Sequence, residues 1–141
     1  MIVGMNPYLV LNGNGQQAVK FYEDVLGAKV ESVQTFGDIP AHPDHPVPDE
    51  AKDRVLHAHL KIANADLMIS DTFPGQPYDA GSHVNLSIGT NDPETTKVIF
   101  DKLSENGYVI MPLQETFWSP LYGQVKDQFD VSWQISTNIE Q

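Results

Sequence analysis

The chain has 141 residues and a formal net charge of −11, from 8 Lys and Arg against 19 Asp and Glu. This length allows one domain, or two small and tightly joined modules, with a buried core. The chain has no cysteine, which excludes disulfide scaffolds, cysteine-ligated metals and thiol nucleophiles.

The composition also limits the partners. Arg54 is the only arginine, and no cluster of basic residues is available to bind a phosphate backbone, so we expect no nucleic-acid partner. No apolar run approaches the roughly 18 residues of a membrane span, and the first residues do not form a signal-peptide pattern. We expect a cytoplasmic protein with no membrane contact, in which the acidity serves solubility.

The first element pair is a strand and a helix joined by a short Gly/Asn turn. A strand is expected at residues 6–11. The helix is expected at residues 15–26, because apolar residues recur there at i, i+3, i+4, i+7 and i+8, and Gly27 ends it. These residues are Ala18, Phe21, Tyr22, Val25 and Leu26.

The same layout returns in "SHVNLSIGTNDPETTKVIFDKL", residues 82–103. A strand over residues 83–88 leads to a helix with Asp92 as N-cap, Pro93 at the first helical position and Gly107 just past the end. Its expected buried face is Val98, Ile99 and Leu103. His83 stands where the first copy has Asn6.

Three further strands are expected after each helix, at about residues 29–37, 54–63 and 66–71, and at about 108–112, 121–127 and 131–137. The last strands resemble each other, "LMISDT" against "WQISTN", which matches Met68 with Gln134. The pattern predicts an α+β fold made by internal duplication. Two βαβββ modules, residues 1–73 and 74–141, would form one compact unit with cupped mixed sheets and helices on the outer face.

The segment 39–53, "IPAHPDHPVPDEAKD", separates two expected strands. Four prolines within residues 40–48 argue against regular structure. His42, Asp44 and His45 suit a metal clip, but a solvated loop with incidental histidines is favoured.

Strand alternation provides the candidate binding residues, because a sheet that packs its apolar face on helices leaves the polar face free. Two such faces together would form a curved wall around a ligand. His57 and His59 share a face opposite Leu56, Ala58, Leu60 and Ile62. The candidates on polar faces are Asn6, Tyr8, His57, His59, Met68, His83, Asn85 and Gln134.

The segment "QETFWSPLYG" adds two adjacent aromatic residues, Phe117 and Trp118. Trp118 is a candidate ligand contact, with a core cover or a dimer contact as alternatives. For Glu115 a surface role is favoured over that of a base. Gln114 and Gln134 offer amide recognition without acid–base chemistry.

Several motifs make the chain similar to a known superfamily. "FYEDVLGAKV" and "HVNLSIGTND" resemble the vicinal-oxygen-chelate superfamily, which includes glyoxalase I, extradiol dioxygenases, fosfomycin-resistance enzymes and bleomycin-resistance proteins. "PYLVLNGNGQQAVKFY", "LMISDTFPG" and "MPLQETFWSPLYGQVKDQFDVSWQI" resemble its PhnB-like branch. The resemblance covers nearly the whole chain.

The resemblance implies a set of four ligand positions, because metal enzymes of this superfamily take one ligand from each of four strands. Here these positions carry Asn6, Met68, His83 and Gln134. Only His83 is a strong ligand for a hard divalent ion, and Gln134 a weak one. We expect no metal cofactor; a divalent ion, if bound, would involve His83 and Gln134.

Some members of the branch are labelled as a 3-demethylubiquinone methyltransferase domain. Methyl transfer from S-adenosylmethionine usually needs a glycine-rich turn after a parallel strand. "LNGNGQQ" has two glycines, but its flanks match the first strand–helix turn of the superfamily. We therefore do not expect methyl transfer.

Two hypotheses about function remain open. In the first, the chain binds an unidentified small molecule in the cavity of its cupped sheets, as a homodimer with undefined catalysis. In the second, it is a metal-dependent lyase, isomerase or dioxygenase that uses His83 with His57 or His59. Whether it is an enzyme stays open at this point.

Overall fold

The computed structural model describes residues 1–40 and 46–138, and the chain divides into two compact units, Met1–Tyr78 and Asp79–Gln141. The first unit contains β1 (Tyr8–Leu11), α1 (Gly15–Leu26), β2 (Lys29–Thr35), β3 (Val55–Ile62) and β4 (Ala65–Asp71). The second contains β5 (Leu86–Thr90), α2 (Pro93–Ser104), β6 (Tyr108–Gln114), β7 (Tyr122–Lys126) and β8 (Ser132–Thr137). The predicted α+β class and repeated βαβββ order are confirmed.

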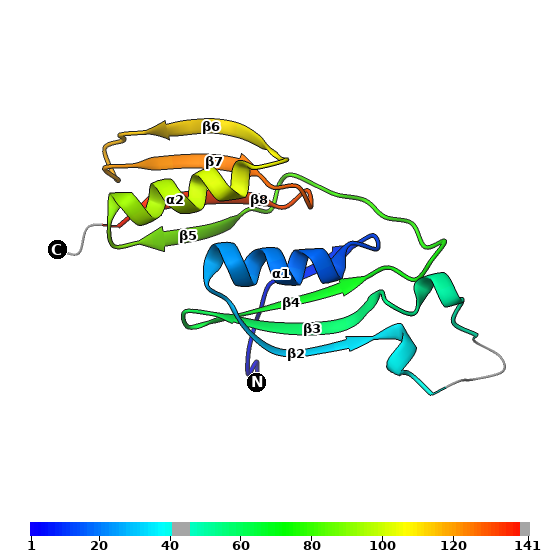
Figure 1. Ribbon diagram of the computed structural model, residues 1–141. Coiled ribbons are helices and arrows are strands. Elements are labelled where there is room, and N and C mark those ends of the chain that lie inside the picture. The colour runs from blue at the N-terminus through cyan, green and yellow to red at the C-terminus, as the bar shows by residue number, and fades with distance from the viewer. Residues whose placement is uncertain (41–45, 139–141) are drawn as a thin grey trace. The chain divides into compact units, whose positions relative to one another are not determined.

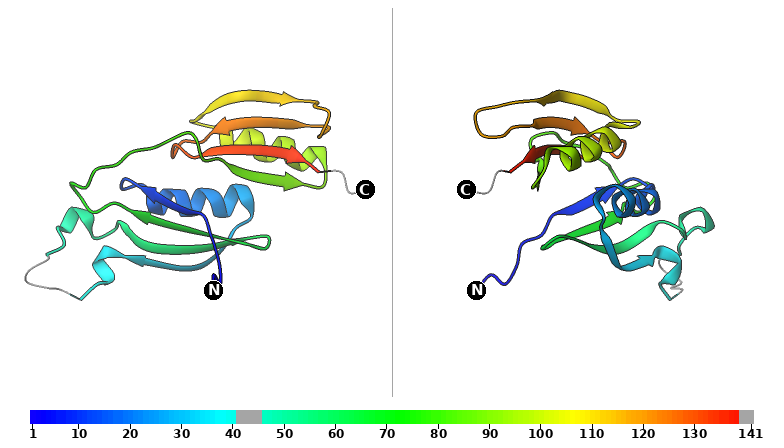
Figure 2. Two further views of the ribbon diagram at one scale, coloured as in Figure 1. Left: turned by 180° about the vertical axis from the view of Figure 1, so that it is seen from behind. Right: turned by 60° about the vertical axis from the view of Figure 1, so that its left-hand side comes forward.

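Each unit forms one four-stranded mixed sheet. The strand orders are β1-β4-β3-β2 and β5-β8-β7-β6. The first strand of each module runs parallel to the last, and the other neighbours are antiparallel. In each unit the helix lies across one face of its own sheet, and the other face carries no helix (Figures 1 and 2).

The end of α1 and the start of α2 follow the expected signals, whereas α2 ends at Ser104 with Glu105 as its C-cap, before the expected Gly107. Gly27 follows α1 with a φ of 65°, in the left-handed region that glycine adopts without strain. At the start of α2, the Asp92 carboxylate accepts hydrogen bonds from Thr95 N at 2.9 Å and Thr95 Oγ1 at 2.6 Å, and Pro93 takes the first turn. These hydrogen bonds lower the pKa of Asp92.

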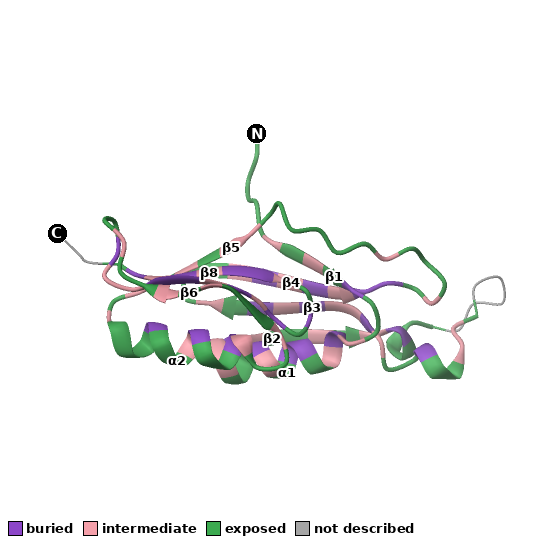
Figure 3. Ribbon diagram, turned by 90° about the horizontal axis from the view of Figure 1, so that it is seen from above, coloured by how far each residue is buried: buried purple, intermediate pink, exposed green. Residues whose placement is uncertain are grey.

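The core of each unit lies between helix and sheet, where buried positions face each other (Figure 3). In the first unit the largest buried side chains include Tyr22, Leu60 and Ile69. In the second unit the core is formed by α2, β7 and β8, with the buried residues Thr96, Phe100, Leu103, Val125, Trp133 and Ile135. None of the helices in the described part of the chain is long and apolar enough to cross a membrane.

The predicted buried face of α2 is partly wrong. Val98 is 48% exposed, whereas Phe100 is 6% exposed and Leu103 is fully buried. The buried stripe runs through Thr96, whose hydroxyl lies 2.7 Å from Thr137 Oγ1 and 2.8 Å from Thr90 Oγ1. These buried polar contacts fix the rotation of the helix, so that Val98, two residues on, points away from the sheet.

Two strand starts and one loop also differ from the prediction. β1 begins at Tyr8 and β5 at Leu86, so Asn6 and His83 precede their strands. Residues Asp49–Ala51 form a 3₁₀ turn with Ala51 fully buried, although irregular structure was expected throughout 39–53. The suggested metal clip of His42, Asp44 and His45 lies outside the described residues.

The assignment of the α2 face is testable by two truncations in one helix. Phe100→Ala should lower the free energy of unfolding by about 3–5 kcal/mol, because it removes a buried aromatic ring. Val98→Ala should change it by no more than about 0.5 kcal/mol, because that side chain is half exposed. Urea unfolding followed by circular dichroism measures both, and a larger loss at Val98 would contradict the assignment.

Candidate functional site

The free face of the second sheet carries a cavity with a partly polar lining. Strand alternation places Val125, Trp133 and Ile135 toward α2, and Gln124, Lys126 and Gln134 on the opposite face. The cavity holds about 660 Å³ and is lined by Ser82, Asn85, Tyr108, Val109, Ile110, Gln124, Lys126, Ser132 and Gln134. All of these residues belong to the second unit.

Cross-strand pairing arranges the polar residues in two neighbouring rows. Gln124 on β7 stands opposite Gln134 on β8, and two residues further Lys126 stands opposite Ser132. On the other side of β8, Ser87 of β5 pairs with Gln134. The cavity floor is therefore set by strand register rather than by loops.

A tyrosine hydroxyl links the two glutamines. Gln124 Nε2 donates to Tyr122 Oη at 2.8 Å, and Tyr122 Oη donates to Gln134 Oε1 at 3.0 Å. Since a tyrosine hydroxyl carries a single proton, it donates to one amide and accepts from the other. Gln134 therefore keeps its amide N–H groups for a ligand, and Gln124 keeps its carbonyl oxygen.

The aromatic loop packs on this tyrosine. The Trp118 ring lies 5.3 Å from the Tyr122 ring in an edge-on arrangement, and Phe117 lies 4.8 Å from Trp118. Trp118 is 57% exposed while Tyr122 is 8% exposed. Trp118 thus positions the tyrosine that links the glutamines, and its indole ring is not part of the cavity lining.

Ser132 is the unusual member of the lining. It is 4% exposed, and its Oγ atom is buried with no hydrogen-bond partner among the described residues. An unsatisfied buried hydroxyl costs about 1–3 kcal/mol relative to a satisfied one. A group bound in the cavity would relieve this cost.

The first unit places several predicted residues together on its own free face. Met68 pairs with Tyr8 on one side and with His59 on the other. Tyr8 Oη lies 3.4 Å from His57 Nδ1, and His59 Nε2 lies 2.8 Å from Asp66 Oδ1. Because an ionised carboxylate only accepts, His59 Nε2 carries the proton in that hydrogen bond.

Asp66 also lies 3.7 Å from Lys61 Nζ. The hydrogen bond from His59 and, to a smaller extent, the charge of Lys61 lower the pKa of the Asp66 carboxyl. The polar groups of this face are therefore paired with one another. In the second unit, by contrast, the Ser132 hydroxyl has no partner among the described residues.

His83 occupies a bend before β5 and is exposed. It does not line the cavity, although its neighbours Ser82 and Asn85 do, with Asn85 Nδ2 donating to Ser82 O at 3.1 Å. The match of His83 with Asn6 is wrong by two residues. Since Tyr8 pairs with Met68 and Ser87 with Gln134, the residue that corresponds to Asn6 is Asn85.

The four inherited ligand positions do not fit a hard divalent metal ion. Asn6 and Gln134 are neutral amides, and Met68 is a thioether. Gln134 Oε1 is already the acceptor for Tyr122. Within the two described units, no group of three or more His, Asp or Glu side chains comes together as a metal site.

Ser82 and residues Tyr108, Val109 and Ile110 of β6 escaped the sequence reasoning, and so did four residues of β7 and β8: Tyr122, Gln124, Lys126 and Ser132. For these four the signal was present, because the predicted strands 121–127 and 131–137 have period-2 alternation that places them on the face of Gln134. Asp66 was missed for another reason. Its contact with His59 depends on the β3–β4 register, which the sequence pattern did not specify.

Comparison with known proteins agrees with this architecture. The family model described as the glyoxalase/bleomycin resistance protein/dioxygenase superfamily matches residues 4–135. The chain belongs to this superfamily.

Its relatives include bacterial proteins of similar length. Protein YjdN of Escherichia coli (strain K12) is 34% identical over 142 residues, covering 94% of this chain and 93% of that protein. The crystal structure of protein PA1353 from Pseudomonas aeruginosa is 32% identical with a TM-score of 0.86, covering 99% of this chain and 100% of the other. A PhnB protein from Bacillus cereus, described as a putative 3-demethylubiquinone-9 3-methyltransferase, shares the fold at 20% identity and a TM-score of 0.79, over 94% of this chain and 98% of the other.

The Asp66 cluster predicts a specific pH dependence. Because the folded state lowers the pKa of Asp66 below its ordinary value of 3.8, its stabilisation is present above that pH and is lost as pH falls through the lowered value. Asp66→Asn should therefore reduce stability at pH 6, and the difference from the parent protein should shrink towards pH 2. Urea unfolding at several pH values measures this.

Asp24→Asn in the exposed part of α1 serves as the control for that series, since it removes a carboxylate without a described partner. A stability difference for Asp66→Asn that stays constant from pH 6 to pH 2 would contradict the assignment.

Proposed function

We propose that the chain is a small-molecule-binding protein of the glyoxalase/bleomycin-resistance type, with its ligand in the cavity of the second unit. The supporting observation is the Gln124–Tyr122–Gln134 hydrogen-bond chain on the cavity floor. It holds two amide groups in a fixed orientation, so that little conformational entropy is lost on binding.

The chemistry of this floor favours a neutral polar group on the ligand. The two glutamines offer one donor and one acceptor side by side, the pattern that complements an amide or imide. Tyr108, Val109 and Ile110 from β6 add apolar surface to the lining. A few convergent polar groups beside apolar surface are typical of ligand sites.

A metal-dependent reaction is less well supported. The hypothesis of a lyase, isomerase or dioxygenase requires His83 together with His57 or His59, and within the described residues no group of three or more His, Asp or Glu side chains forms a metal site. In the first unit, His59 is already hydrogen-bonded to Asp66. The neutral amides and the thioether at the other three positions compensate for little of the free-energy cost of dehydrating a divalent ion.

Binding in the cavity is testable with succinimide and glutarimide, small imides that offer an N–H between two carbonyls. Their addition should shift the amide signals of Gln124, Ser132 and Gln134 in ¹H–¹⁵N spectra of the full chain. Gln134→Leu should weaken binding about tenfold or more, because it removes one hydrogen bond to the ligand.

Gln128→Leu is the matched control for this experiment. It makes the same substitution in the β7–β8 turn, at an exposed residue outside the cavity, and should leave the affinity unchanged. Signals that shift only outside the second unit would refute the proposed site.

Metal content gives a separate test. Protein purified without a histidine tag should contain less than one zinc or nickel ion per chain, and His83→Ala should not change that content, because the donor set is weak. Elemental analysis by mass spectrometry measures it. One divalent ion per chain that disappears with His83→Ala would instead support the metal-dependent enzyme.

A further inference from the structure

The internal duplication allows the two free sheet faces to be compared row by row. In the first unit, β3 and β4 pair His59 with Met68 and Lys61 with Asp66. In the second, β7 and β8 pair Gln124 with Gln134 and Lys126 with Ser132. Both hairpins therefore carry a lysine at the same position, and the residue opposite the lysine differs.

In the first unit the lysine faces a carboxylate from its own chain. Asp66 Oδ1 lies 3.7 Å from Lys61 Nζ and 2.8 Å from His59 Nε2. Asp66 thus pairs with both the Lys61 ammonium group and the His59 ring.

In the second unit that carboxylate is missing. Ser132 takes the place of Asp66, and its buried Oγ has no partner among the described residues. Within residues 1–40 and 46–138, Lys126 forms no ion pair. Both residues line the cavity.

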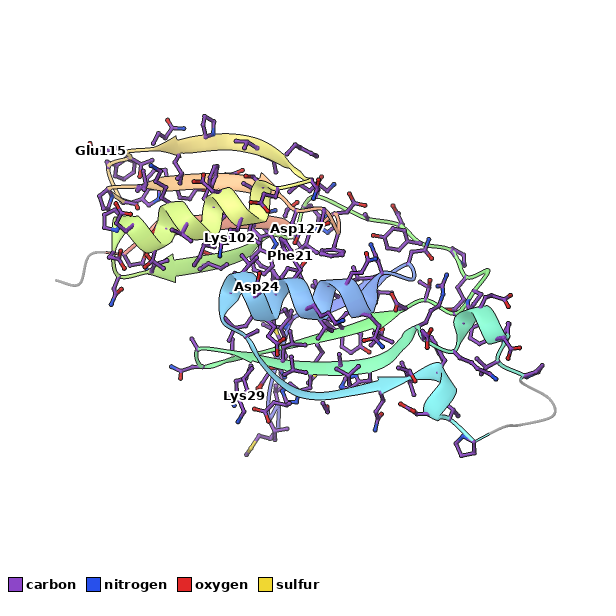
Figure 4. All side chains as sticks on the ribbon, viewed as in Figure 1. Phe21, Asp24, Lys29, Lys102, Glu115 and Asp127 are labelled. Carbon is purple, nitrogen blue, oxygen red and sulfur yellow. The ribbon has the colours of Figure 1, made fainter. Side chains whose placement is uncertain are left out.

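Two acidic residues that adjoin the strands of this sheet do not fill this position. Asp127 follows Lys126, but its carboxylate accepts from Phe129 N at 2.8 Å, Val131 N at 3.1 Å and Trp133 Nε1 at 2.8 Å. Glu115 follows β6, at the end of the second sheet opposite to Asp127 (Figure 4). Neither Asp127 nor Glu115 therefore supplies a carboxylate to Lys126, which lines the cavity.

We propose that the ligand supplies this carboxylate: it is a small molecule with a carboxylate bound by Lys126 and Ser132 and an amide-like group bound by Gln124 and Gln134. The assignment rests on the proposed function and names its ligand class. Lys126 lies two residues from Gln124 on one strand and Ser132 two residues from Gln134 on the next. The two groups are therefore separated by about 7 Å, the length of two strand residues.

The ammonium group supplies charge, and the serine hydroxyl supplies a second hydrogen bond. A charge-assisted hydrogen bond to a carboxylate is about twice as strong as a neutral one. Ser132 lines the cavity, and its hydroxyl has no partner among the described residues, so a bound carboxylate would supply the missing hydrogen-bond acceptor. The bound carboxylate then takes the role that Asp66 has in the first unit.

The test uses two probes of equal length. 4-Acetamidobutanoate carries a carboxylate and an acetamide group about 6–7 Å apart, and 4-acetamidobutanamide replaces the carboxylate by a neutral amide. In ¹H–¹⁵N titrations of the full chain at pH 7 and low salt, the acid should bind about tenfold more tightly than the amide, with shifts at Lys126, Ser132 and Gln134. Lys126→Gln should bring the ratio of the two affinities close to one.

Lys61→Gln is the matched control, because it removes the corresponding lysine of the first unit, and it should leave the ratio unchanged. Ser132→Asp gives the converse change by placing the carboxylate of the first unit into the second. It should abolish the preference for the acid while retaining binding of the amide. Circular dichroism verifies that each variant is folded, and Lys126→Gln decides the question if Ser132→Asp does not fold.

The outcomes separate the two proposals. If acid and amide bind equally to the parent chain with shifts at Gln124 and Gln134, the cavity is a binding site but the carboxylate assignment is wrong. The same conclusion follows if Lys126→Gln keeps the full preference for the acid. If neither probe shifts any signal of a cavity residue, both the carboxylate assignment and the proposed site are wrong.

Discussion

One constraint determines the rest of the structure: each module has a single helix, which can bury only one face of its four-stranded sheet. Alternate residues of β7 and β8 are thereby divided into a buried set, Val125, Trp133 and Ile135, and a free set that includes Gln124, Lys126 and Gln134. A shift of one residue in register would exchange the two sets. The positions of the polar side chains that β7 and β8 contribute to the cavity therefore follow from the packing of α2, which in turn depends on Thr96, Phe100 and Leu103.

Duplication preserved this frame while the chemistry of the two free faces diverged. In the first unit, the Asp66 carboxylate accepts a hydrogen bond from His59 and lies beside the Lys61 ammonium group, so these polar groups are paired within the chain. In the second, a lysine remains at the corresponding position, but glutamine and serine replace the histidine and the aspartate. Because a buried hydroxyl without a partner is costly, Ser132 supports the proposal that the second face binds an external group.

Membership of the glyoxalase/bleomycin resistance protein/dioxygenase superfamily accounts for the architecture. It does not determine the chemistry, which depends on the residues of the individual site. In this chain Gln134, which would be only a weak metal ligand, makes a different contact. Its carbonyl oxygen accepts a hydrogen bond from the Tyr122 hydroxyl, and Trp118 packs on that tyrosine. An amide held in this way orients a polar group, whereas a metal ligand would need a negative charge or an imidazole at the same place.

The sequence alone determined the elements of the fold, because helix periodicity, the Asp92 cap, Gly27 and strand alternation are local signals. It also placed Gln134, His57, His59 and Met68 on free sheet faces. It misplaced Val98 and put His83 on a strand, since helix rotation and strand ends depend on contacts such as Thr96–Thr137 that join residues 41 positions apart. Only the tertiary structure paired Lys126 with Ser132 and Asp66 with His59, because register across a hairpin is decided by which side chains the whole module can bury.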